Sequence, residues 1–321
     1  MFLPENWLNL IIKNPVMKTK ILSVLFCLIF LGAKSQDLHF LNNNQSLLLL
    51  NPSFAGSNNA WRIQSTSANI YPNLNSSQHS NYLGVDGMIK PIKGAVSLSF
   101  VGNNFSRGIL KEQFIHLAYA QHFTLGDKKL KLIPSIQISY LQRQLDLNSL
   151  TFGGPYYPVQ FNSQLNNSKA NLDFSSGLLA QYKNFYGGIS VMHITQPDIG
   201  INGKSNLPSS FNVHSVYSIK YSEKLMMQFF ALYNQQASYK ALLLQINTLL
   251  YSHLLFGVGT DTHDQSMLSA GYRNNYISTL LSFGFNWSKL ARTPYQAINL
   301  SLAFKLPKEK DANPNQSFER W

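Results

Sequence analysis

Alternation of apolar and polar side chains is the dominant pattern in this 321-residue chain. It is clearest from 130 to 144, where one set of alternate positions is apolar and the other is polar. The apolar set is Leu130, Leu132, Ile136, Ile138 and Tyr140, and the polar set is Lys131, Ser135, Gln137, Ser139 and Arg143. Because strand side chains alternate with a period of two, the pattern predicts a two-faced β-strand. Pro134 lacks a backbone donor, so we expect it near the start of that strand.

The same alternation divides the chain into about fourteen candidate strands. They are 61–71, 78–89, 94–103, 109–124, 130–146, 172–183, 185–195, 212–221, 224–235, 238–249, 254–261, 266–273, 276–287 and 295–306. Short connections follow the even-numbered strands, whereas the long connections 147–171, 196–211 and 288–294 follow odd-numbered ones. Tight periplasmic turns and large external loops are typical of outer-membrane barrels, which have an even strand number in bacteria. This order predicts that both termini lie in the periplasm.

Composition narrows the fold class. Charged residues make up 12% of the chain, about half the usual share, and aromatic residues reach 13%. Beyond the amino-terminal region no apolar run approaches 18 residues, which excludes a helical membrane protein. A soluble β-sandwich also alternates, but its outer face is usually rich in charge. Here the polar positions are mostly Ser, Asn, Gln, Gly and Ala. The sequence therefore favours an all-β fold, a transmembrane antiparallel outer-membrane β-barrel with an amino-terminal periplasmic segment.

The amino-terminal region has the features of a secretory signal peptide. A basic start at 17–20 precedes the apolar run 21–31, and small residues stand at Ala33 and Ser35. We expect cleavage before Gln36, because the apolar run is shorter than the ~20 residues of a membrane anchor. The expected divisions are 1–16, an upstream extension from a mis-assigned start codon; 17–35, the signal peptide; 36–60, the periplasmic segment; 61–306, the barrel; and 307–321, a polar periplasmic tail. Cys27 falls within the signal, so the mature chain would have no cysteine.

The stretch LLLLNPSFAG, from Leu47 to Gly56, is the candidate functional segment. Proline fixes φ and disfavours helix in the preceding residue, so a helical turn across 44–50 should end at Asn51-Pro52. Burying a leucine is worth about 1.5–3 kcal/mol, so the leucines should pack against the inner wall or rim of the barrel. Two interpretations stay open: a leader tucked under the barrel mouth, and a plug or docking segment. The candidate residues are Leu47, Leu48, Leu49, Leu50, Asn51, Pro52, Phe54, Ala55, Gly56 and Arg62.

Charge and candidate chemistry point away from nucleic acid and from catalysis. Without residues 1–35, which hold four basic residues and one acidic residue, the net charge falls from +12 to +9. The basic residues are scattered singly in a chain that we expect to be secreted, so no nucleic-acid partner is predicted. Asp261, His263 and Asp264 share one loop, but their spacing fits no recognised metal site. His193 and His214 have no carboxylate nearby in the sequence. We therefore predict no enzyme, no cofactor and no metal.

The opening of the mature chain resembles the PorP/SprF family of outer-membrane proteins of the type IX secretion system. The likeness rests on Gln36-Asp37 and Phe40, then on the motif at 51–56, then on Arg62 and Gln64. Ser65 departs from the family, which often has tryptophan there. The resemblance implies a Gram-negative outer-membrane location and a role as an accessory barrel in protein secretion, often linked to gliding motility. It implies as partners a secreted adhesin or its C-terminal domain, periplasmic lipoprotein ring components and outer-membrane lipid. The alternatives are a passive or hydrophobic-solute channel and a structural adhesin or lectin-like barrel.

Overall fold

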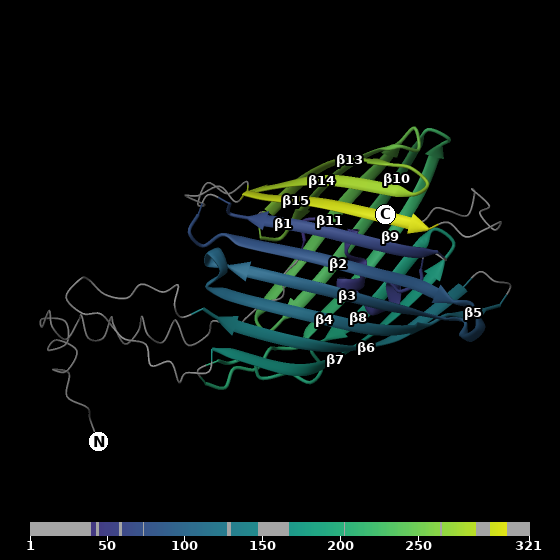
Figure 1. The fold of residues 1–321 in the computed structure, drawn as a ribbon. Helices are drawn as coiled ribbons and strands as arrows, with labels where there is room; N and C mark the ends of the chain where they lie inside the picture. Colours follow the sequence, from purple (N-terminus) through teal and green to yellow (C-terminus); the bar gives the residue numbers. More distant parts are fainter. Residues whose placement is uncertain are drawn as a thin grey trace, which may run out of the picture. The chain divides into compact units, whose positions relative to one another are not determined.

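The described part of the chain is built almost entirely from antiparallel β-strands (Figure 1). A computed structural model describes residues 40–42, 45–57, 60–72, 74–126, 130–146, 167–201, 203–263, 265–286 and 296–306. The strands are β1 (Trp61–Ile70), β2 (Gln78–Ile89), β3 (Gly94–Phe105), β4 (Leu110–Gln121), β5 (Phe123–Leu125), β6 (Leu130–Leu145), β7 (Ser168–Tyr182), β8 (Phe185–Met192), β9 (Ser210–Ser222), β10 (Leu225–Gln236), β11 (Tyr239–Leu250), β12 (Leu254–Asp261), β13 (Gln265–Arg273), β14 (Ile277–Asn286) and β15 (Gln296–Leu306). Short helical turns are α3 (Leu47–Leu50), η2 (Pro52–Phe54), η3 (Lys90–Ile92) and η4 (Ser106–Gly108).

The sheet closes on itself. Each strand pairs with its neighbours in sequence, except that β4 and β5 both pair with β6. The ring is closed by β1 and β15, which pair from Trp61↔Leu306 to Ile70↔Ala297. β5 extends β4 along the same partner, β6, so the fifteen strands occupy fourteen positions around the ring. A closed ring has no unpaired edge, and closure is what allows β-structure to span a membrane. The predicted barrel is confirmed.

The break between β4 and β5 has a local cause. The register is the same on both sides, with Ala120 opposite Ser135 and Phe123 opposite Leu132. Gln121, the last residue of β4, is therefore level with Pro134. Proline has no N–H to donate to the ladder, so pairing lapses there and then resumes. Pro134 lies near the beginning of β6, as expected.

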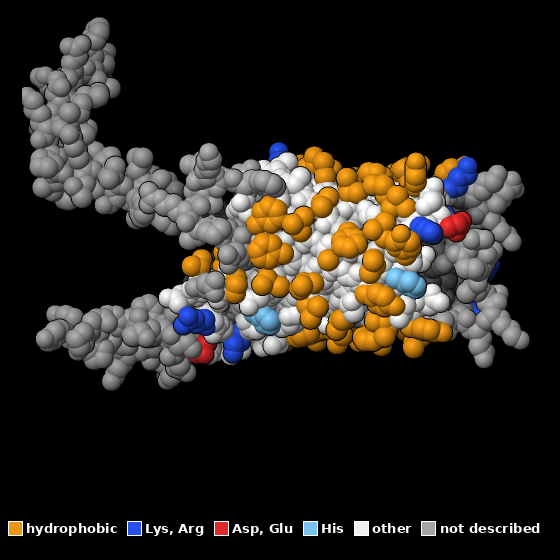
Figure 2. Space-filling model, turned by 90° about the horizontal axis from the view of Figure 1, so that it is seen from above, with side chains coloured by type: hydrophobic (Ala, Val, Ile, Leu, Met, Phe, Trp, Pro, Cys, Tyr) orange, Lys and Arg blue, Asp and Glu red, His pale blue; other side chains and the backbone are white. Residues whose placement is uncertain are grey.

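The two faces of the wall divide as the alternation predicted. Ile136 is 67% exposed, whereas Ser135 and Gln137 beside it are each 5% exposed. Figure 2 shows apolar side chains spread over the outside of the barrel. Tyr182 and Phe185 face outward at the ends of β7 and β8. None of the described helices is long and apolar enough to cross a membrane.

Strand boundaries follow the prediction with two instructive differences. β7 begins at Ser168 instead of 172, because its first residues still pair with β6 as far as Ser168↔Gln144. β8 ends at Met192 instead of 195, because His193 adopts a φ of 55°, in the left-handed region where a strand cannot continue.

The connections define two mouths, which we call the turn mouth and the loop mouth. At the turn mouth lie 90–93, 183–184, 223–224, 251–253 and 274–276, together with Trp61 and Leu306. At the loop mouth lie the described residues of the connections 71–77, 106–109, 193–209, 237–238 and 262–264. The expected long connection 196–211 is realised as 193–209, whereas most of 147–171 and all of 288–294 lie outside the described residues.

Candidate functional site

Residues 40–42 and 45–57, which we call the lumen segment, run inside the barrel from one mouth to the other. Phe40 packs near the loop mouth against Ala68, Tyr82 and Val101. Gly56, at the other end, donates from its backbone N–H to Asp86 Oδ2 at 2.9 Å, close to the turn mouth. The segment therefore leads through the lumen into β1.

We expected 36–60 to precede the first strand in the periplasm, with Leu47–Gly56 either at the periplasmic mouth or inside the lumen and its leucines against the wall. Of these two places, the described residues occupy the lumen. The described part lies within the barrel because its leucines find an apolar wall there. The expectation that both termini lie in the periplasm stays a prediction, because the termini lie outside the described residues. The first described residue is at the loop mouth and the last, Leu306, is at the turn mouth, so the described chain does not have both ends on one side.

The four leucines pack into apolar clusters inside a lumen whose wall also carries many buried polar side chains. α3 covers Leu47–Leu50, shorter than the expected turn across 44–50. Leu48 is 2% exposed, and Leu47 and Leu50 are buried with it. Their cluster includes the wall residues Ile133, Leu179, Tyr186, Val216, Phe230 and Leu232. Leu49 points to a second cluster, which holds Phe40. Removing these side chains from water stabilises the seated segment.

Asn51 and Pro52 make the turn that follows the leucines. Asn51 is extended, at φ −154° and ψ 118°, as the residue before a proline should be. Its Oδ1 accepts from Ser53 N at 2.9 Å, and its Nδ2 donates to the carbonyl oxygen of Ile189 at 3.0 Å. Ser190 Oγ donates to the carbonyl oxygen of Leu50 at 2.6 Å. The buried polar groups of the turn are thus paired with the wall.

The wall opposite this turn is shaped to receive it. Ser53 Oγ and Ser135 Oγ are 2.8 Å apart. At Gly177, the partner of Ser135 in β7, a Cβ atom would lie 2.0 Å from Asn51 Oδ1. A glycine is therefore required there by close approach of the segment.

Three further contacts hold Phe54, Ala55 and Gly56. The Phe54 ring lies on the His214 ring, with centroids 5.1 Å apart. His122 Nε2 donates to the carbonyl oxygen of Ala55 at 3.0 Å. Gly56 has a φ of +64°, and a Cβ there would lie 2.3 Å from the Cβ of Ala95. Both features demand glycine at this position.

Arg62 and Asp86 form a buried ion pair at the exit of the segment. Arg62 Nε donates to Asp86 Oδ1 at 2.8 Å, and the two side chains are 1% and 0% exposed. Asp86 thereby ties Gly56 of the segment to Arg62 of β1. Sequence reasoning selected Arg62 but missed Asp86. The signal was present, because β1 and β2 each carry one formally charged residue, of opposite sign and on the inward face.

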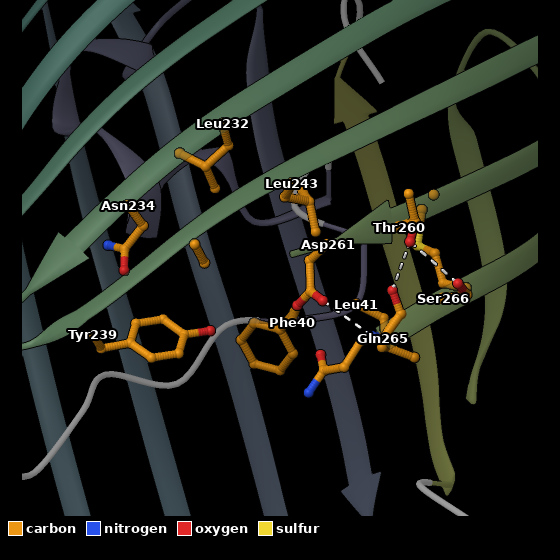
Figure 3. A pocket seen from close by; sticks show the side chains of 13 residues that line it. Phe40, Leu41, Leu232, Asn234, Tyr239, Leu243, Thr260, Asp261, Gln265 and Ser266 are labelled. Carbon is orange, nitrogen blue, oxygen red and sulfur yellow. Dashed lines mark hydrogen bonds between the residues drawn. The ribbon is translucent and has the colours of Figure 1, made fainter. Parts of the chain in front are cut away.

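A cavity of about 60 Å³ lies beside Phe40 at the loop mouth (Figure 3). Its lining includes Leu41, Leu243 and Met267, with Tyr239 and Asp261 as polar members. Asp261 Oδ1 accepts from the backbone N–H groups of His263 and Gln265, at 2.8 and 3.0 Å. Asp264, the third residue of the loop weighed as a metal site, lies outside the described residues.

The two histidines considered for catalysis have different surroundings. His214 is buried against Phe54. His193 Nδ1 lies 2.6 Å from Asp173 Oδ2, and Thr195 Oγ1 donates to Asp173 Oδ1 at 2.7 Å. Sequence reasoning missed Asp173 because it lies on the neighbouring strand. This group of side chains anchors the start of the connection 193–209 to β7.

When the sequence is compared with models of protein families, one family matches. The family model described as type IX secretion system membrane protein PorP/SprF matches residues 33–304. No curated protein matches the chain.

Several solved barrels have a broadly similar fold. Omp33 of Acinetobacter baumannii is 10% identical, with a TM-score of 0.45, covering 78% of this chain and 100% of that one. The monoaromatic hydrocarbon channel CymD is 11% identical, with a TM-score of 0.49 and coverages of 84% and 94%. The toluene transporter TodX of Pseudomonas putida is 10% identical, with a TM-score of 0.47 and coverages of 85% and 99%.

Proposed function

The chain belongs to the PorP/SprF family of type IX secretion system membrane proteins, and from that premise we propose that it is an accessory outer-membrane barrel for a large secreted adhesin. It supports the export or the surface attachment of that adhesin, whose C-terminal domain meets the loop mouth. Periplasmic lipoprotein ring components of the secretion system dock at the turn mouth. No catalytic step and no cofactor is part of this role.

The observation that carries the proposal is the occupied lumen. Leucine burial and side-chain hydrogen bonds hold the lumen segment against β2, β4, β6, β7, β8 and β9. A passive pore needs an open path, whereas a barrel that serves as a docking platform does not. We propose that Leu47–Gly56 is the plug and the docking element of the platform.

The test places charge on the leucines. The double change Leu48→Asp with Leu49→Asp should unseat the segment, because a carboxylate in an apolar cluster costs several kcal/mol. The ring of strands is closed by its own ladder and should persist. We expect cells to lose adhesin display while they keep a heat-modifiable barrel in the outer membrane. Leu48→Met with Leu49→Met, which preserves the apolar contacts, is the control and should retain display.

One result of this test contradicts the docking role, and another calls for a second variant. If cells carrying Leu48→Asp with Leu49→Asp display the adhesin normally, the segment is only a leader packed under the barrel mouth and has no docking role. Loss of the barrel would make the segment a part of the fold, and a second variant then decides its role. Ser53→Cys with Ser135→Cys should join the segment to the wall, because the two hydroxyl oxygens are 2.8 Å apart. Display that falls on oxidation and returns on reduction supports a segment that must move, whereas display unaffected by either treatment rejects movement.

A hydrophobic-solute channel is the second candidate, and the cavity beside Phe40 is the observation that favours it. In planar bilayers the native barrel should be closed and the acidic pair should conduct, if the segment is a plug. Steady conductance or uptake of an apolar solute by the native protein would favour the channel instead.

A further inference from the structure

The direction of the lumen segment has a consequence for the topology of the chain. Leu41 packs at the loop mouth with Met267 and Ala297, beside Ile70 at the end of β1. Gln245 Nε2 donates to the carbonyl oxygen of Leu41 at 2.8 Å. The chain therefore enters the barrel at the loop mouth, descends to Asp86, and returns upward as β1. The lumen segment and β1 together form a hairpin whose outer arm is part of the wall.

The chain upstream of Phe40 is then restricted to one side. With cleavage before Gln36, four residues precede Phe40, and they reach about 14 Å at most. β1 rises about 33 Å along its length over ten residues. Four residues cannot return to the turn mouth even along a tilted strand. We infer that the mature amino terminus is displayed at the loop mouth, on the opposite side from Leu306.

This arrangement makes the lumen segment a covalent connection between the two faces. The backbone that a partner would bind at the loop mouth continues through the lumen to Gly56. Asp86 accepts a hydrogen bond from Gly56 at the turn mouth. The surface offered at the loop mouth includes the segment's first residues as well as the strand connections. The inference does not depend on the proposed role in secretion, because it follows from the path of the backbone.

Single cysteines test the inference, since the mature chain has none of its own. Asp37→Cys reports on the amino terminus, and His39→Cys replaces it if processing to the mature size is disturbed. Ser76→Cys marks the loop mouth and Lys224→Cys marks the turn mouth, both at exposed positions. Each variant is treated with a membrane-impermeant maleimide on whole cells and on opened cells. In opened cells the reagent reaches both mouths, so the comparison between the two preparations is what discriminates. We expect Asp37→Cys to show the same pattern of labelling across the two preparations as Ser76→Cys, and a different pattern from Lys224→Cys.

If the labelling pattern of Asp37→Cys matched that of Lys224→Cys and differed from that of Ser76→Cys, the inference would be overturned. A cysteine at 37 that reacts in neither preparation until the barrel is denatured would also overturn it, because that cysteine would then lie inside the lumen. Whether Ser76→Cys reacts on whole cells is a separate outcome. It decides which mouth faces outward, and therefore tests the placement of partners in the proposed function without affecting this inference.

Discussion

At the scale of single residues, side-chain hydrogen bonds to the wall hold the turn of the lumen segment at Asn51 and Ser53. Asn51 is fully buried, and burying an amide without partners would cost several kcal/mol. The side chain avoids that cost because its amide donates to carbonyl oxygens on β7 and β8. This fit depends on Gly177, which leaves room for Asn51 against the wall.

Gly177→Ala should therefore displace the turn at Asn51–Ser53. The new methyl would lie 2.0 Å from Asn51 Oδ1, so the hydrogen bonds of the turn must break or shift. Each such bond contributes about 1 kcal/mol, and we expect the seated segment to lose about 1–3 kcal/mol. Hydrogen exchange of the backbone of Leu47–Gly56 measures this as protection reduced about tenfold or more.

Gly187→Ala is the matched control for that experiment. It adds the same methyl on β8, where the nearest atoms belong to the end of the Phe185 ring, 3.1 Å away. Protection of the lumen segment should be unchanged in this variant. Equal loss of protection in both variants would mean that the methyl weakens the wall in general, and would remove the special role of Gly177.

At the scale of elements, the sequence predicts strands well and the lumen contacts poorly. Lipid and water on opposite sides of one wall impose a strict alternation, and this is why β2 and β12 match the predicted bounds at both ends. The leucine motif could be recognised as a buried segment for the same energetic reason. Its partners could not, because Ser135, Gly177 and Ile189 meet Asn51 and Ser53 only through the register of distant strands. The direction in which the lumen segment runs through the barrel also could not be predicted from the sequence.

The carboxylate of Asp198 holds the connection 193–209 in place through several hydrogen bonds. Asp198 accepts from Lys169 Nζ and from the backbone N–H groups of Gly200 and Ser205. Asn171 Nδ2 donates to the carbonyl oxygen of Asp198 at 2.6 Å. The hydrogen bond from Lys169, followed by those from the backbone, lowers the pKa of Asp198 from 3.8 to about 2.

Acid should therefore loosen this connection at a defined point. Because the folded pKa lies below the unfolded value, the contribution of Asp198 is present above the unfolded pKa and is lost as the pH falls through about 2. Limited digestion with pepsin should cut within 193–209 much faster near pH 2 than near pH 4. Asp198→Asn should be cut readily at both values. A native connection whose cleavage shows no such rise, relative to the rest of the barrel, would contradict the role of Asp198.

At the scale of the whole molecule, the barrel separates a lipid-facing surface from a polar interior. Leu281, midway along β14, is 55% exposed and pairs with Leu300 of β15 in the wall. Tyr221, near the end of β9 at the turn mouth, is 81% exposed. The two positions sample the middle and the border of the apolar surface.

A positive charge should be tolerated at the border and not in the middle. Leu281→Arg should destabilise the barrel by about 2–4 kcal/mol, and Tyr221→Arg by about 0–1 kcal/mol, because the cost of an arginine on the lipid face depends on depth. Urea unfolding in lipid vesicles measures both. Equal costs at the two positions would be inconsistent with a membrane centred on β14.

The seam between β1 and β15 also bears on how the molecule is assembled. Synthesis completes the segment and β1 first and β15 last, so the ring has no means of closing until the chain is whole. Chains rarely thread through closed loops. A lumen segment that already lies across the open sheet avoids threading, because it is enclosed when β1 and β15 pair. The leucines can then serve as the template around which the wall wraps. In that order of events the lumen segment already occupies the interior when the barrel closes, so an empty barrel never forms.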